Sequence, residues 1–145
     1  MVVQVIDYNA STAPDFYFFD DQVRIPSGPF SLELAELEIN IGDEELNRVE
    51  LIATIGTETP ELQHILYTIY RDGVKIFDTR QGTQNIETTT FQAIDFNLSP
   101  GKHVYNLKVE VLEDTSTSKV VGPLSFSALA IEVGPPSTKG SGRQI

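Results

Sequence analysis

Hydrophobic and polar residues alternate along most of this chain, which is the pattern of β-strands that bury one face and expose the other. Residues 105–111 show the alternation, and so do residues 47–56, where one face carries Val49, Leu51, Ala53 and Ile55. No stretch of about 11 residues or more has the periodicity of an amphipathic helix. The pattern therefore predicts an all-β protein made of antiparallel sheets.

Turn signals divide this pattern into strands. Asp72-Gly73 lies between two β-prone runs and favours a type I′ hairpin, because both residues tolerate positive φ. Residues 99–102, Ser-Pro-Gly-Lys, fit a type II turn. Breaks are also expected at residues 41–43 and 57–60. The expected strands are residues 2–6, 16–19, 23–25, 31–41, 47–56, 63–71, 74–79, 86–98, 103–112 and 120–133.

Two of the expected strands change phase internally. In residues 31–41 the apolar positions shift from even to odd numbers, which predicts a β-bulge near Ala35-Glu36. In residues 120–133 a similar shift after Ala128 predicts a second bend. Bent strands with turns at roughly ten-residue spacing are typical of a β-sandwich or jelly roll.

The two ends of the chain differ from its middle. Residues 1–29 hold a short β-prone run, a flexible stretch, an aromatic patch at residues 16–19 and then prolines and a glycine. The last residues are rich in Gly, Pro and Ser, as linkers are. We expect an N-terminal extended connector arm at 1–29, a jelly-roll domain at 30–133 and a linker-like tail at 134–145.

The N-terminal arm is a candidate for contacts between copies. Its β-prone run is too short to be stable alone, and it could pair with a sheet edge of another copy or within its own domain. Four consecutive aromatic residues cannot all face one core, because neighbours in a strand alternate sides. They form either a strand buried on both faces or a contact with another chain. The predicted assembly interface is Val2, Val3, Val5, Ile6, Phe16, Tyr17, Phe18 and Phe19.

Charge and composition exclude several classes of function. The 145 residues include 21 acidic and 10 basic side chains, a formal net charge of −11 that disfavours nucleic acid and anionic membranes as partners. The absence of cysteine excludes disulfides and thiolate metal sites. No signal-peptide pattern or membrane-length apolar run occurs, so we expect synthesis in the cytoplasm of the producing cell.

Candidate chemistry is sparse. The acidic pairs and clusters at residues 20–21, 43–45 and 113–114 could offer oxygens to Ca²⁺ or could be solvated loops, and none has EF-hand spacing. His64 and His103 are not accompanied by a nucleophile elbow. We predict no catalytic, cofactor-binding or metal-binding residues and no enzymatic activity, and leave calcium binding by a loop open.

Residues 49–56, 65–76 and 101–107 resemble the small jelly rolls of bacterial spore-surface proteins. These are the tumour-necrosis-factor-like tip domains of collagen-like exosporium proteins and the subunits of pilus-like endospore appendages. The resemblance covers about residues 30–133. It implies trimers or head-to-tail fibres, no catalysis, and an N-terminal connector that docks into the neighbouring subunit, in the place of residues 1–29. Some appendage connectors carry cross-linking cysteines, whereas this chain has none.

We therefore expect a structural, self-assembling subunit of a non-covalent extracellular fibre on the spore surface, which polymerises through its N-terminal arm and has only itself as partner. A trimeric binding or tip module, such as a phage fibre head or a carbohydrate-binding domain, is the alternative, and it needs an exposed aromatic or calcium-bearing site. A small β-fold enzyme is a third interpretation, and it needs a converging polar pocket.

Overall fold

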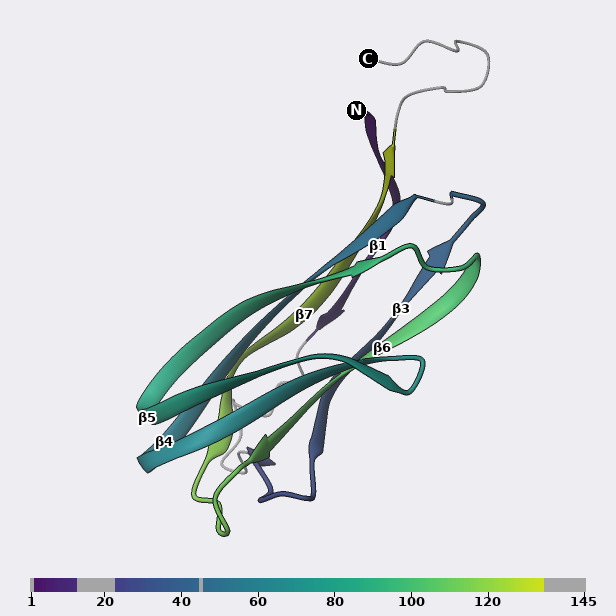
Figure 1. The fold of residues 1–145 in the computed structure, drawn as a ribbon. Helices are drawn as coiled ribbons and strands as arrows, with labels where there is room; N and C mark the ends of the chain where they lie inside the picture. The colour runs from purple at the N-terminus through teal and green to yellow at the C-terminus, as the bar shows by residue number, and fades with distance from the viewer. Residues whose placement is uncertain (1, 13–22, 45, 135–145) are drawn as a thin grey trace, which may run out of the picture.

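The computed structural model describes residues 2–12, 23–44 and 46–134, and all regular structure in this part of the chain is β-strand (Figure 1). The aromatic patch at residues 16–19 and the tail from residue 135 lie outside the described residues. The strands are β1 (Val2–Thr12), β2 (Val23–Arg24), β3 (Leu32–Ile41), β4 (Asn47–Arg71), β5 (Val74–Phe96), β6 (Gly101–Val111) and β7 (Lys119–Gly134).

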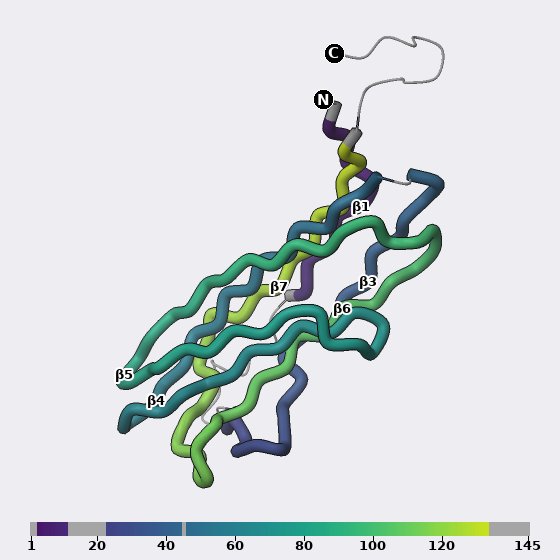
Figure 2. Tube along the Cα trace, in the orientation of Figure 1, coloured from purple at the N-terminus to yellow at the C-terminus, as the bar shows by residue number. Residues whose placement is uncertain are grey.

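The strands form two layers, and β4 and β5 run through both of them. Residues 47–58 of β4 pair with β7, whereas residues 65–71 pair with β6. β5 follows β4 antiparallel along almost its whole length. One layer therefore contains β1, β7, the first half of β4 and the second half of β5, and the other contains β3, β6 and the remaining halves. Figure 2 shows the β4–β5 hairpin bending where it passes between layers.

The predicted break at residues 57–60 is wrong. The chain continues there as β4, and the pairing with β5 shifts register between Thr59 and Gln63. Pro60 falls within this shift, so its missing N–H removes no regular ladder bond. Gln63 is buried at the bend, donates to the Thr115 carbonyl and accepts from the Ser118 hydroxyl, both at 2.7 Å.

The core lies between the layers and consists of the inward faces that the alternation predicts. Each side chain that faces inward in residues 49–55 of β4 and 105–111 of β6 is buried. The largest completely buried side chains are Tyr67, Tyr105, Phe126, Ile25 and Ile39. The predicted all-β antiparallel sandwich is confirmed.

One of the two predicted bends is present. β3 shifts its register against β6 between Glu33 and Ala35, which places the confirmed bulge slightly before the predicted position. β7, in contrast, keeps its register against β4 from residue 124 to residue 132. The second predicted bend is therefore wrong, because Leu129 and Ile131 lie on the outward face of β7 and not on a shifted inward face.

The predicted hairpin turn is also confirmed. Asp72 and Gly73 have φ values of 50° and 83°, as a type I′ turn requires. At the start of β6, Gly101 has a φ of 119°. A side chain at either glycine would be strained by its backbone conformation.

The N-terminal segment pairs within its own chain. β1 pairs antiparallel with β7 from Val2–Gly134 to Thr12–Ser125, and β2 pairs with β7 as well. Figure 1 shows the start of β1 beside the end of β7. Asp7 and Asn9 reach across to β3, where they bond the Asn40 amide at 2.8 Å and the Glu38 carbonyl at 3.0 Å. In this structure the arm therefore pairs within its own domain and not with another copy. Exchange of β1 between copies stays a prediction.

Candidate assembly surface

The outward face of the β1–β7–β4–β5 layer carries an unusual number of apolar side chains. They lie in register across the layer, because paired residues of neighbouring strands share a face. Val5 is opposite Ile131, and Tyr8 is opposite Leu129. We call this set the apolar face: Val3, Val5 and Tyr8 of β1, Leu129, Ile131 and Val133 of β7, Ile52 of β4, and Ile94 and Phe96 of β5.

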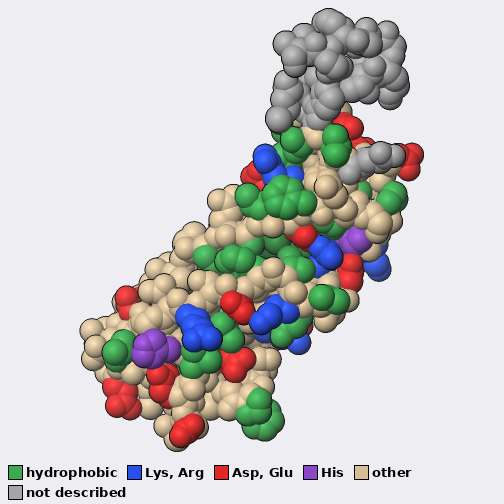
Figure 3. Space-filling model, in the orientation of Figure 1, with side chains coloured by type: hydrophobic (Ala, Val, Ile, Leu, Met, Phe, Trp, Pro, Cys, Tyr) green, Lys and Arg blue, Asp and Glu red, His purple; other side chains and the backbone are tan. Residues whose placement is uncertain are grey.

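Much of the apolar face is exposed to solvent. Val5 is 66% exposed and Phe96 is 60% exposed, and Tyr8, Val3, Ile94 and Ile52 are also exposed. Figure 3 shows hydrophobic side chains near the described ends of the chain, next to charged ones, and further hydrophobic groups elsewhere on the visible face. Arg48 and Glu50 lie among them as an ion pair of 3.0 Å. This charged pair lies on β4 between the apolar residues of β7 and those at the end of β5. Clusters of exposed apolar side chains are a feature of surfaces at which proteins associate.

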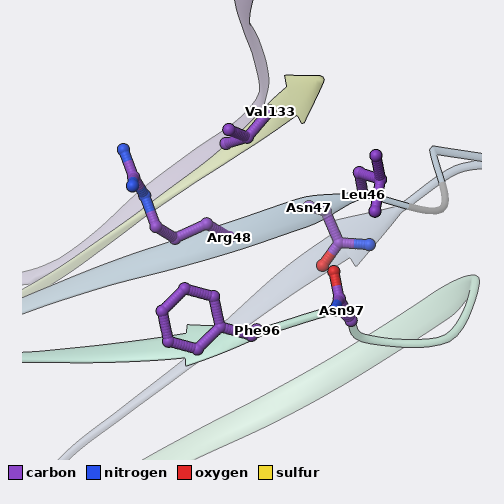
Figure 4. Close-up of a pocket in the computed structure, with 6 residues that line it drawn as sticks. All are labelled: Leu46, Asn47, Arg48, Phe96, Asn97 and Val133. Carbon is purple, nitrogen blue, oxygen red and sulfur yellow. The ribbon is translucent and has the colours of Figure 1, made fainter. Parts of the chain in front are cut away.

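A small pocket lies at one end of the apolar face. Its volume is about 150 Å³, and it is lined by Leu46, Asn47, Arg48, Phe96, Asn97 and Val133. Figure 4 shows that Val133, Arg48 and Phe96 come from three neighbouring strands. The Arg48 Nε atom is buried and has no hydrogen-bond partner among the described residues. The pocket therefore has Leu46, Phe96 and Val133 as apolar walls, with the side chains of Arg48 and two asparagines at its border.

Asn47 fixes the loops around this pocket. Its buried side chain donates to the Glu44 carbonyl at 2.7 Å and to the Leu98 carbonyl at 2.9 Å, and it accepts from the Leu98 amide at 2.8 Å. The Val133 amide also donates to the Leu46 carbonyl at 2.8 Å. These bonds join both loops to the sheet, so the pocket is formed before any partner binds.

A polar cleft of about 220 Å³ adjoins the pocket and shares Phe96 and Asn97 with it. Arg71, which lines the cleft, donates to both oxygens of Asp95 at 2.7 and 2.6 Å, and the buried Tyr105 hydroxyl donates to Asp95 at 2.9 Å. The hydrogen bond to Asp95 raises the pKa of Arg71, and burial followed by the Asp95 charge raises the pKa of Tyr105.

His103 lies in the same cleft, with both ring nitrogens bonded. Nδ1 is 2.7 Å from Asp72 and Nε2 is 2.7 Å from the Ser99 carbonyl. Each ring nitrogen thus contacts a group of the protein itself, and the ring is held from two sides. The converging polar groups of this cleft therefore hold one another and brace the loops beside the apolar face.

Two of the acidic residues that could have held calcium, Glu113 and Glu44, are hydrogen-bonded to neighbouring groups of the protein. Glu113 accepts from the His64 amide at 2.8 Å and lies 2.7 Å from its ring, which lowers the pKa of Glu113. Glu44 accepts from the Gly42 amide at 3.0 Å. Residues 20, 21 and 45 lie outside the described part. Within the part described, no three His, Asp or Glu side chains converge on a metal site, and no helix could cross a membrane.

The structure places the predicted interface residues in different surroundings. Val3 and Val5 belong to the apolar face, whereas Ile6 lies at the bulge between Val5 and Asp7 and packs partly against the core. The backbone of Val2 pairs with Gly134. The aromatic patch, Phe16, Tyr17, Phe18 and Phe19, lies outside the described residues.

The sequence interpretation missed the members of the apolar face on β4, β5 and β7. Adjacent apolar residues, such as Leu51-Ile52 and Ala130-Ile131, were the available signal. In a strand such neighbours point to opposite faces, so one of each pair must leave the core.

Comparison with known proteins gives the fold and not the family. No protein-family model and no curated protein sequence matches the chain. A structure of infectious bursal disease virus, Gx strain, matches with a TM-score of 0.57 and 14% identity, over 88% of this chain and 32% of that one. The T13 particle of infectious bursal disease virus matches with a TM-score of 0.55 and 15% identity, over 87% of this chain and 35% of that one.

A further match is dimeric latent PorU from Porphyromonas gingivalis, with a TM-score of 0.53 and 4% identity, over 87% of this chain and 12% of that one. The chain thus spans about a third or less of the length of these proteins. Such low identities show a shared sandwich of the jelly-roll kind and carry no function with them.

Proposed function

We propose that this protein is a structural module that assembles with copies of itself through the apolar face, without covalent links. The observation that supports the proposal is the set of exposed apolar side chains that β1, β4 and β5 place on one layer, since a monomer rarely leaves a large apolar surface uncovered. The absence of cysteine means that no disulfide takes part.

The proposal extends to an extracellular fibre on the spore surface, in which β1 takes part in joining the subunits. Its basis is the resemblance of residues 49–56, 65–76 and 101–107 to spore-surface jelly rolls, together with the place of Val3 and Val5 on the apolar face. The fold itself is compatible with assembly, because sandwich domains with exposed edges readily add strands.

Substitutions on the apolar face test the proposal. Purified protein should form oligomers or fibres in sedimentation and negative-stain microscopy, with and without reductant. Val5→Ser combined with Ile94→Ser should weaken the association at least about tenfold, because each removes apolar contact area. Ile86→Ser is the control, because Ile86 is equally exposed but lies outside the apolar face. A wild-type chain that stays monomeric at all soluble concentrations would overturn the proposal.

A second candidate function is that of a binding module, favoured by the position of Phe96 between the pocket and the polar cleft. An exposed aromatic ring beside polar groups is a common feature of small-ligand sites. Nuclear magnetic resonance titration of the chain with soluble polysaccharides tests this function. Shifts confined to Asn97, Ser99 and Phe96 that disappear in Phe96→Ala would favour it, whereas unchanged spectra would oppose it.

A further inference from the structure

Phe30 is an exposed aromatic side chain on a firmly held loop. It lies between β2 and β3 and is 73% exposed. The loop is fixed by backbone bonds from the Gly28 amide to the Val111 carbonyl at 2.9 Å and from the Val111 amide to the Pro26 carbonyl at 2.8 Å. The Phe30 amide donates to the Ser27 carbonyl at 3.2 Å. The ring is therefore presented to solvent by an ordered backbone.

The pocket beside Phe96 lies at the other end of the sandwich. Phe30 shortly precedes Leu32, which pairs with Val109 near the end of β6, whereas the pocket borders the loop that leads into Gly101, where β6 begins. The ten steps along β6 correspond to about 33 Å. Figure 1 likewise places the start of β3 and the start of β4 at opposite ends. A chain cannot reach its own pocket with Phe30, but a second copy can.

We infer that copies of this chain join end to end, with Phe30 of one copy inserted between Leu46, Phe96 and Val133 of the next. The inference rests on the proposed function and specifies the contact that lengthens the assembly. A contact between different surfaces at opposite ends does not close on itself, so its repetition gives a filament.

The size and chemistry of the two surfaces agree. The open pocket has a volume of about 150 Å³, which is of the size that a benzene ring occupies, and the phenyl ring of Phe30 is such a group. Phe96 forms one wall of the pocket, where two aromatic rings can pack in an offset or edge-to-face arrangement.

The charges beside the two surfaces are complementary. At the Phe30 end, the Glu110 carboxylate lies against Gly28, a residue of the same loop as Phe30. The Arg48 guanidinium borders the pocket, partly exposed and 3.0 Å from Glu50. An entering copy therefore brings a carboxylate towards a guanidinium, and opposite charges favour this orientation of the two copies.

Two complementary variants test the inference. Phe30→Ser removes the inserted ring and keeps the pocket, and Val133→Trp fills the pocket and keeps the ring. We expect both to remain folded by circular dichroism and neither to form filaments. When the two variants are mixed, Phe30 of the Val133→Trp variant should enter the open pocket of the Phe30→Ser variant. Sedimentation should then show a 1:1 complex that neither variant forms alone. If Val133→Trp does not fold, Leu46→Trp closes the same pocket from an exposed position.

The outcomes separate this inference from the proposed function. Filaments formed by Phe30→Ser, or folded variants that give no new complex on mixing, would overturn the inference. If Phe30→Ser still assembles while Val5→Ser with Ile94→Ser does not, the proposed function stands and only the end-to-end contact is wrong. Ile86→Ser serves again as the exposed control.

Discussion

The ring of His103 lies between two hydrogen-bond acceptors, one of which is the Asp72 carboxylate at 2.7 Å from Nδ1. The other is the Ser99 carbonyl at 2.7 Å from Nε2. Both partners are hydrogen-bond acceptors, so neither can donate to the ring. His103 thereby ties the β4–β5 turn to the loop between β5 and β6, and both segments line the polar cleft.

Replacing His103 should destabilise the domain. His103→Gln leaves the Asp72 carboxylate or the Ser99 carbonyl without its buried partner, which costs about 1–3 kcal/mol of unfolding free energy. His64→Gln is the matched control, because the His64 side chain is 52% exposed and its ion pair with Glu113 lies at the surface. We expect its effect to stay below about 1 kcal/mol in urea denaturation. Equal losses for both variants would contradict the role given to His103.

Stability should fall in acid, partly through Asp72. Burial raises the pKa of Asp72, but the hydrogen bonds from the Val104 amide and His103 outweigh it and hold the pKa below its ordinary 3.8. A lowered pKa in the fold contributes stability above about pH 4, which is lost as the pH falls through the folded value. Denaturation followed from neutral pH to below pH 4 should show a shallower loss in Asp72→Asn than in the wild type. Parallel curves would refute this assignment.

Two buried tyrosines should respond differently to loss of the hydroxyl group. Tyr105→Phe removes the 2.9 Å bond to Asp95 and should cost about 1–2 kcal/mol. Among the residues that the structure describes, the buried Tyr67 hydroxyl has no partner of good geometry, although Thr89 lies near it. Burial raises the pKa of Tyr67 to about 12. Tyr67→Phe should therefore be neutral or stabilising in thermal denaturation. A larger loss for Tyr67→Phe than for Tyr105→Phe would show that its hydroxyl is bonded after all.

Gly56 should not tolerate a side chain. A Cβ atom at this position would overlap the carbonyl group of Gly122, which is backbone and cannot move aside. Gly56→Ala should cost about 1–3 kcal/mol or more, as overpacking does. Gly82→Ala is the control, since its Cβ would meet nothing closer than His64 Cδ2 at 3.6 Å. Melting temperatures of the two variants decide, and a stable Gly56→Ala would rule out the close approach of β4 and β7.

Local sequence determined the strands, their inward faces and the tight turns. The alternation in residues 47–56 and 105–111 identifies buried positions because side chains in a strand point to opposite faces in turn. Asp72-Gly73 predicts its turn because few residue pairs accept two positive φ values. The bulge in β3 is visible as a phase change, since one extra residue moves the apolar side chains to the other face.

Only the tertiary structure decided how the outward faces combine. The residues at 57–60 resemble a turn, yet they stay extended because β5 and β7 supply partners on both sides of β4. The phase change after Ala128 resembles a bulge, but it reflects a strand with apolar residues on both faces. The apolar face and the pocket beside Phe96 join residues from distant parts of the chain. Their proximity follows from strand order and register, which depend on long-range pairing that no local pattern encodes.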